Sequence, residues 1–257
     1  MYEAMMIAAT GLQNQQRRLD TIANNVANVN STAYKSARLD FKDALYTAGI
    51  VPAKPRTPEG NQQKGHGLMI AGIARSFSTG VFQSTERSLD VAVEGEGFIE
   101  LGNGNGDIVF TRNGSFDLSV EEDGTYLVNS DGLYVHSAQG DRIPVPDGAD
   151  TININQDGSI TFIADEEETT VRLGVYTFRN ITGLLSTGNG TYAESPASGE
   201  KLPADGAVIR QGVLEGSNVD LSEEMTRLIR TQRTFQLASR ALTTADEMEG
   251  IANNMRR

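Results

Sequence analysis

The stretch Leu19–Lys35, "LDTIANNVANVNSTAYK", decides how the first part of this 257-residue chain folds. Its apolar residues continue a seam spaced alternately by three and four residues, which predicts an amphipathic helix. Asparagine is a mediocre helix former because its amide competes for backbone hydrogen bonds, so four asparagines here need a reason beyond helix propensity. We expect the helix to break at Ser31–Thr32. The seam consists of Met5, Ala8, Leu12, Gln15, Leu19, Ile22, Val26 and Val29.

A second heptad pattern occupies the other end of the chain. No proline or glycine interrupts it from Asn218 until Gly250, so it predicts one long helix. Ser222 is one candidate N-cap, and Asp220 is the other because Glu223 follows it by three residues. The apolar stripe contains Leu221, Met225, Leu228, Phe235 and Leu242 and continues, slightly shifted, through Ala245, Met248, Ala252 and Met255.

The middle of the chain has the pattern of a β domain. Short alternating apolar runs, separated by turn residues, fill residues 76–213 and predict strands. Asn-Gly and Asp-Gly pairs favour the positive φ angles of tight hairpins. Residues 51–67 contain three prolines and three glycines without apolar periodicity, so we expect an extended connector. The four hairpin signals are Asn113-Gly114, Asp123-Gly124, Asp131-Gly132 and Asp157-Gly158.

These patterns predict an α+β chain of several parts. We expect an N-terminal helical region over residues 1–50, a connector over 51–75, a β domain over 76–213 and a C-terminal helix within 214–257. The two terminal helices are expected to pair as a coiled-coil-like core, with a mainly antiparallel β domain between them.

The charge is distributed unevenly along the chain. Residues 1–75 hold nine basic and five acidic residues, whereas residues 76–213 hold seven and twenty-two. An acidic middle disfavours binding to nucleic acid or to anionic membranes. No run approaches the roughly 18 apolar residues of a membrane span, and the N-terminus lacks the basic start of a secretory signal. We expect a protein that stays in the cytoplasm or is exported without a cleaved signal, and that inserts into no membrane.

The sequence offers no positive evidence of catalysis. It has no cysteine, and its two histidines, His66 and His136, are far apart. Gly95 and Gly97 lie in a glycine-rich stretch, but no helix pattern follows as a nucleotide-binding motif requires. The acidic runs at 121–124 and 165–168 lack the spacing of a calcium-binding loop. We therefore expect no catalytic, cofactor or metal site.

Two amphipathic helices at opposite ends of a chain need a partner for their apolar stripes. Pairing with one another covers part of each stripe, and other subunits can cover the rest. A contact between different faces of identical subunits generates a helical polymer, whereas a contact of one face with itself closes into a dimer. Residue patterns alone thus favour an assembling, non-enzymatic protein.

Three blocks of the sequence carry a resemblance to a known family. The stretch "LDTIANNVANVNSTAYKSAR" (19–38) resembles the N-terminal signature of the flagellar axial proteins of the rod and hook. Residues 89–116 resemble the mid-chain block of that family, and residues 216–248 resemble its C-terminal helix, with Gln232 and Arg233 at its Gln-Arg core. Chain length and residues 66–98 look most like the distal-rod members, with proximal-rod and hook-type members as the alternatives.

The resemblance implies a structural role. Such proteins leave the cell unfolded through the flagellar type III export apparatus and stack as a helical tube with other rod and hook proteins. The tube transmits torque from the motor to the hook, and the paired terminal helices form its inner wall. The expected location is the flagellar basal body, outside the cytoplasmic membrane.

The asparagines have a candidate role in such a tube. Asn24, Asn25 and Asn28 share a face beside the seam, where an amide that bonds neighbouring backbones fixes one register. Asn30 is expected to end the helix because asparagine tolerates positive φ. The predicted assembly interface comprises Leu12, Leu19, Ile22, Asn24, Asn25, Val26, Asn28, Val29, Leu221, Met225, Leu228, Gln232, Arg233, Phe235 and Leu242.

One departure from the family and one rival function complete the predictions. The family commonly has glycine where this chain has Ala33, so a positive φ there costs alanine about 1 kcal/mol. The rival is a β-domain glycan-binding protein or hydrolase with a coiled-coil clamp. It requires a concave site with clustered carboxylates or exposed aromatic side chains. The chain has no tryptophan and sixteen Phe and Tyr residues, so few aromatic side chains are available to stack on sugar rings.

Overall fold

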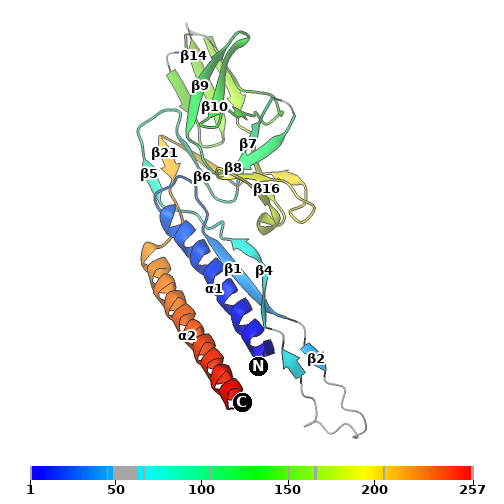
Figure 1. The fold of residues 1–257 in the computed structure, drawn as a ribbon. Coiled ribbons are helices and arrows are strands. Elements are labelled where there is room, and N and C mark those ends of the chain that lie inside the picture. Colours follow the sequence, from blue (N-terminus) through cyan, green and yellow to red (C-terminus); the bar gives the residue numbers. More distant parts are fainter. Residues whose placement is uncertain are drawn as a thin grey trace. The chain divides into compact units, whose positions relative to one another are not determined.

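A computed structural model describes residues 2–44, 46–48, 63–65, 67–104, 106–146, 148–149, 151–164, 167–204 and 206–255. The chain divides into two compact units. The helical unit comprises residues 1–27, 37–75 and 220–257, and the β unit comprises residues 28–36 and 76–219. Along the sequence, one helix precedes and one helix follows a series of antiparallel strands, so the predicted α+β class is confirmed (Figure 1).

Two long helices dominate the helical unit. α1 (Tyr2–Ala27) and α2 (Leu221–Asn254) contact each other and run antiparallel, so both chain termini lie at the same end of the pair (Figure 1). α1 also contacts a two-stranded sheet in which β1 (Ala37–Asp43) pairs antiparallel with β4 (Leu68–Arg75). The register runs from Ala37 opposite Arg75 to Asp43 opposite Leu68 and shifts once between Asp40 and Phe41.

The start of α2 follows from local capping chemistry. The Asp220 carboxylate accepts hydrogen bonds from the backbone N–H groups of Ser222 (2.8 Å) and Glu223 (3.1 Å). A side-chain acceptor at this position satisfies donors that have no partner within the helix. Of the two predicted caps, Asp220 is therefore confirmed, and the helix begins at Leu221.

The end of α1 differs from the prediction. α1 ends at Ala27 rather than at Ser31, and the next residues form turns. The Ser31 N–H donates to the Asn28 carbonyl, and its hydroxyl donates to the Asn28 side chain, which closes a turn in place of the next helical turn. Positive φ occurs not at Asn30, as predicted, but at Ala33 (φ 54°), which is buried.

The β unit contains one large sheet and three small ones. The large sheet has the order β12-β10-β11-β7-β8-β18-β17, with β9 on β10 and with β16 pairing β7 and β19. The small sheets are β13-β14-β15, β20-β6 and β21-β5. The elements are β5 (Phe82–Ser84), β6 (Val91–Glu94), β7 (Phe98–Gly102), β8 (Ile108–Thr111), β9 (Phe116–Glu121), β10 (Gly124–Asn129), β11 (Tyr134–Val135), β12 (Pro144–Val145), β13 (Thr151–Ile154), β14 (Ser159–Ala164), β15 (Glu167–Arg172), β16 (Val175–Phe178), η2 (Ile181–Gly183), β17 (Leu185–Gly188), β18 (Thr191–Ala193), β19 (Lys201–Pro203), β20 (Val208–Gln211) and β21 (Val213–Glu215).

Two buried clusters hold the β unit together. The larger one is mainly aliphatic and draws residues from both the large and the small sheets, including Ile99, Leu101, Phe116, Ile160 and Ile209. These side chains are at most 2% exposed. The smaller cluster is aromatic: Phe98, Phe110, Phe178 and Tyr192 meet edge to face, with the Phe110 and Phe178 ring centres 4.9 Å apart. Edge-to-face contacts add to the stabilisation from burial alone.

Three of the four predicted hairpins are confirmed. Asp123-Gly124 joins β9 to β10, Asp131-Gly132 joins β10 to β11, and Asp157-Gly158 joins β13 to β14. The glycine of each pair has positive φ. The prediction at Asn113-Gly114 is wrong, because β8 pairs with β7 and β18 and not with β9. Gly114 is required there for another reason, since a Cβ atom would lie 1.8 Å from the Val91 carbonyl oxygen.

The predicted connector lies largely outside the described residues. Within 51–67, the structure describes only Gly67 and residues 63–65, which form β3 (Gln63–Gly65). β3 pairs antiparallel with β2 (Tyr46–Ala48). Residues 68–75, also expected as connector, form β4.

Candidate assembly interface

The apolar seam of α1 is partly covered within the helical unit. Ile22 is buried, and Leu12, Leu19 and Val26 are half-buried. Val29, also predicted for this seam, lies half-buried in the turn after the helix. On α2 the matching stripe of Leu228, Phe235 and Leu242 is half-buried at spacings of seven residues.

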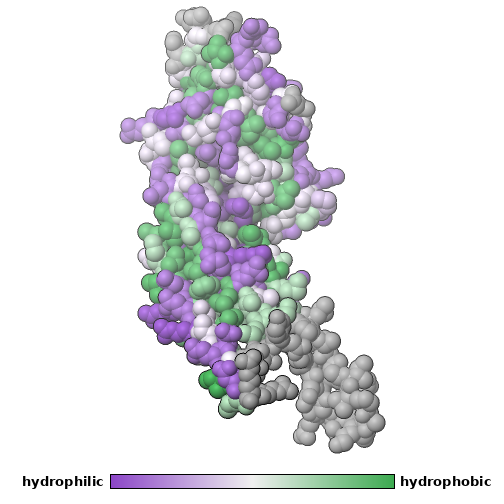
Figure 2. Space-filling model, viewed as in Figure 1, coloured by the Kyte–Doolittle hydropathy of each residue, from purple (hydrophilic) through white to green (hydrophobic). Residues whose placement is uncertain are grey.

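Two groups of apolar residues on α2 remain exposed, and we call them the first and the second ridge. The first ridge is Leu221, Met225 and Ile229, spaced by four residues and 42–51% exposed. The second ridge is Leu237, Met248, Ile251 and Met255, 58–78% exposed. At 100° per residue, the first ridge lies beside the half-buried stripe and the second ridge lies nearly opposite it, so the two ridges are about a third of a turn apart. Figure 2 shows green hydrophobic residues among purple hydrophilic ones on the surface of the helices.

The remaining predicted interface residues are polar. Asn24, Gln232 and Arg233 are exposed, and Asn28 is half-buried with its side-chain oxygen accepting from Ser31 at 3.1 Å. The predicted stripe on α2 therefore divides: Leu221 and Met225 face outward, whereas Leu228, Phe235 and Leu242 are half-buried. A role for all of these residues between subunits remains a prediction.

Two buried asparagines on α1 hold the neighbouring sheet. The Asn25 side-chain oxygen accepts from the Ala37 N–H (3.0 Å), and its NH₂ group donates to the Ala37 carbonyl (2.9 Å). Three turns closer to the N-terminus on the same face, the Asn14 NH₂ group donates to the Leu68 carbonyl at 2.6 Å. The eleven-residue spacing corresponds to three helical turns, so both amides face the β1–β4 sheet. A role for Asn14 was not predicted from the sequence, although its spacing of eleven residues from Asn25 places both on one face of a helix.

A buried ionic cluster lies in the β unit, and we call it the buried triad: Lys35, Arg112 and Glu215. The Lys35 ammonium donates to the Glu215 carboxylate at 2.7 Å, and the Arg112 guanidinium approaches its other oxygen at 3.3 Å. All three side chains are at most 3% exposed. The same carboxylate accepts from the Gly80 N–H at 2.8 Å. Charges removed from water in this way are tolerated only when paired and hydrogen-bonded.

Backbone carbonyls satisfy the cations of the triad further. Lys35 donates to the Ser78 carbonyl at 2.8 Å, and Arg112 donates to the Val93 carbonyl at 3.1 Å. Burial lowers the pKa of Lys35 below its ordinary value of 10.5, and the hydrogen bond from Lys35 to Glu215 opposes that shift. No sequence pattern pairs residues 180 positions apart, so the triad was not predicted.

The loop after α1 and the segment before α2 meet beside this triad. The Ala33 N–H donates to the Glu215 carbonyl at 2.7 Å, and the Ser36 N–H donates to the Asn218 side chain at 2.7 Å. Asn218 also donates to the Ser76 carbonyl at 2.8 Å. The β unit is therefore complete only with residues from both ends of the chain.

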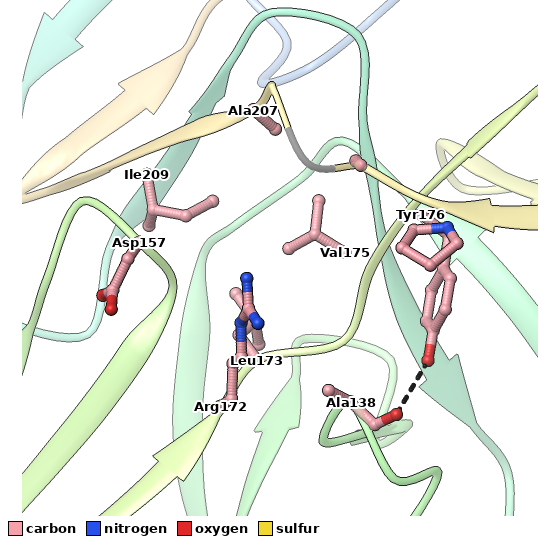
Figure 3. Close-up of a pocket in the computed structure, with 10 residues that line it drawn as sticks. Ala138, Asp157, Arg172, Leu173, Val175, Tyr176, Ala207 and Ile209 are labelled. Carbon is pink, nitrogen blue, oxygen red and sulfur yellow. Dashed lines mark hydrogen bonds between the residues drawn. The ribbon is translucent and has the colours of Figure 1, made fainter.

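One described cavity in the β unit does not resemble a hydrolase site. It measures about 420 Å³ and has Asp157 and Arg172 on one side and Tyr176 on the other (Figure 3). The Tyr176 hydroxyl donates to the Ala138 carbonyl at 3.2 Å. Hydrogen bonds from Ser159 lower the pKa of Asp157, so this carboxylate is poorly suited to act as a general acid.

Glycoside hydrolysis ordinarily uses two facing carboxylates, and among the described residues that line this cavity Asp157 is the single acidic one. Across the described part of the chain, no three His, Cys, Asp or Glu residues group to hold a metal ion. No helix in that part of the chain combines the length and apolar character of a membrane span. His66, one of two histidines considered above, lies outside the described residues.

Three family models match the sequence. The one described as "Flagella basal body rod protein" matches residues 5–35, "Flagellar hook protein FlgE/F/G D1 domain" matches 92–162, and "Flagellar basal body rod FlgEFG protein C-terminal" matches 210–255. The buried triad takes one residue from each matched segment: Lys35 from the first, Arg112 from the second and Glu215 from the third.

Full-length relatives agree with these segments. The chain is 36% identical over 270 residues to the flagellar basal-body rod protein FlgG of Borreliella burgdorferi, and the match covers all of both chains. It is 35% identical over 268 residues to FlgG of Bacillus subtilis, again covering both completely. With FlgG of Agrobacterium fabrum the identity is 35% over 97% of this chain and 98% of the relative.

Proposed function

The chain belongs to the family of flagellar basal-body rod proteins, and from this premise we propose that copies of it assemble through the helical unit into a helical tube. It is a structural subunit of the basal body and not an enzyme. Membership of the rod and hook family also implies assembly with other rod and hook proteins.

The two exposed ridges of α2 carry this proposal. Seven large apolar side chains on one helix are 42–78% exposed, while the core of the β unit is almost fully buried. Covering one such side chain contributes about 1.5–3 kcal/mol, so the ridges favour association strongly. Exposed apolar surface of this kind is typical of a protein–protein interface.

The placement of the ridges supports an open polymer over a closed dimer. Because they lie on different faces of α2, about a third of a turn apart, one ridge can contact one neighbour while the other ridge contacts a different neighbour. A contact between unlike surfaces that does not close into a ring continues as a helix of subunits. In this arrangement α1 and α2 pair as a coiled-coil-like core along the half-buried stripe, as the heptad pattern predicts.

The place of this tube within the flagellum follows from the family. We infer a distal-rod-like subunit that transmits torque from the motor toward the hook and reaches its site through the flagellar export apparatus. A proximal-rod position is the second candidate, because the same helical core serves either. The acidic β unit needs no covering partner for its core.

A pair of full-length variants tests the proposal. Ile229→Asp and Leu237→Asp place a charge in the first and the second ridge, and each should raise the concentration needed for assembly by about 10- to 100-fold, since each 1.4 kcal/mol corresponds to a factor of ten. Val120→Asp is the control, because Val120 is 81% exposed but lies in the β unit. Light scattering and electron microscopy report the polymer. Assembly of both ridge variants at the wild-type concentration would refute the proposal.

A further inference from the structure

A small cavity in the helical unit is lined with arginines, and we call it the arginine pocket. It measures about 150 Å³ and lies between α1, β1 and the first turns of α2. A volume of this size admits the end of one side chain. Its lining residues are Arg18, Thr21, Ile22, Ala37, Arg38, Leu39, Glu224 and Arg227.

The residues that line the pocket include three arginines and one glutamate. Arg227 pairs with two acids, the buried Glu224 at 2.9 Å and the exposed Glu223, which leaves Arg18 and Arg38. Arg38 bonds Asp40 at 3.0 Å, but both side chains are largely exposed, and such pairs contribute little. Arg18 lies 5.9 Å from the centre of the Phe41 ring, and no acidic residue in the described part of the chain pairs with it. Arg18 is therefore the cation of the pocket that is available to bind an anionic group.

The opposite end of the same helix pair has the complementary charge. Residues 221–240 of α2 hold four arginines against two glutamates, whereas residues 241–254 hold three acids and no base. Asp246 and Glu247 are exposed in these last turns. The two arginines that follow, Arg256 and Arg257, lie outside the described residues.

These acids cannot reach the pocket of their own chain. Nineteen residues separate Arg227 from Asp246 along one helix, and a rise of 1.5 Å per residue places them about 28 Å apart. Both belong to α2, so their separation is fixed by the helix. Only another copy of the chain can bring the acidic turns to the arginine pocket.

We propose that the arginine pocket accepts a carboxylate, from Asp246 or Glu247, of a second copy of this chain. The contact deepens the proposed function, on which it rests, because it joins one end of a helix pair to the opposite end of the next. Guanidinium groups bind carboxylates in paired hydrogen bonds of fixed geometry, so the contact fixes the direction and register of stacking. The ridges supply the attraction, and the pocket selects the alignment.

Charge reversal in the full-length chain tests this contact. Arg18→Glu should raise the concentration needed for assembly about fivefold to tenfold, and the double variant Asp246→Arg with Glu247→Arg should do the same. Arg17→Glu is the matched control, since Arg17 is exposed on the neighbouring position of α1 and does not line the pocket. An assembly concentration for Arg18→Glu equal to that of the control would overturn the inference.

Mixing the two variants gives the sharper result. In an equimolar mixture, each reversed pocket meets a reversed helix end, so alternating copies should assemble within about twofold of the wild-type concentration. Such rescue also demonstrates that both variants fold. Failure of the mixture to improve on the single variants would overturn the contact while leaving the ridges intact. Failure of the wild-type chain to assemble at all would instead overturn the proposed function.

Discussion

The two units of this chain bury their apolar side chains to different extents. The β unit buries Phe98, Ile99, Leu101 and Phe116 completely, and the charges of its triad are paired within the chain. The helical unit leaves whole ridges of α2 exposed, and β4 adds Ile73, which is 64% exposed. A closed core stabilises a unit on its own, whereas an open helix face stabilises it only in contact with a partner.

The difference explains how one chain serves a polymer. A self-sufficient β unit keeps its structure before and after assembly, so the free energy of association is concentrated in the helices. The buried triad joins residues from the beginning, middle and end of the sequence inside that unit.

The largest effect is expected from the buried triad. Glu215→Gln leaves Lys35 and Arg112 buried without their carboxylate, which should lower the free energy of unfolding of the β unit by about 3–5 kcal/mol. Denaturant unfolding followed by the near-ultraviolet circular dichroism of tyrosine measures the change. The control is Glu94→Gln, whose pair with Arg210 is exposed and should lose at most about 1 kcal/mol. Equal losses in the two variants would contradict a central role for the triad.

A smaller effect on stability is expected from the hydrogen bonds between Asn25 of α1 and strand β1. Asn25→Ala removes both hydrogen bonds to Ala37 and should destabilise the β1–β4 sheet by about 2 kcal/mol, because two backbone groups lose their partner. Hydrogen exchange at the amides of β1 should accelerate accordingly, while exchange in the β unit stays unchanged. Gln13→Ala, at an exposed position of α1, serves as the control. Unchanged exchange in β1 would show that the Asn25 amide is dispensable to the helical unit.

The smallest effect concerns Ala33 and has the opposite sign. Its φ of 54° lies in the left-handed region, where glycine has no steric penalty, so Ala33→Gly should raise the stability of the β unit by about 1 kcal/mol. Ala23→Gly, four residues before the end of α1, should instead destabilise by a similar amount. Thermal unfolding compares the two, and a loss of stability in both would refute strain at Ala33.

Local chemistry made part of this fold predictable. Both terminal helices follow from apolar residues at helical spacing, and the Asp220 cap follows from its distance to Glu223. Gly124, Gly132 and Gly158 mark hairpins because a tight turn needs a residue at positive φ. Each of these features depends on residues within one or two turns of one another.

Other features depend on contacts that spacing does not encode. Gly114 carries the same local signal as the other turn glycines, yet a close approach to the Val91 carbonyl decides its role. α1 ends early because Asn28 and Ser31 bond each other and Ala33 turns the chain toward Glu215. The triad joins residues 35, 112 and 215, which only the folded β unit brings together.

The most direct test of the contrast is hydrogen exchange of the wild-type chain, measured in dilute solution and in the assembled polymer. We predict that amides of α2 beyond Leu237 exchange rapidly in the dilute chain and become strongly protected in the polymer. Amides of β7, such as Ile99 and Leu101, should be equally protected in both states because their core is already closed. Equal protection of α2 in the two states would contradict the account, since the helical unit would then be complete without a neighbour.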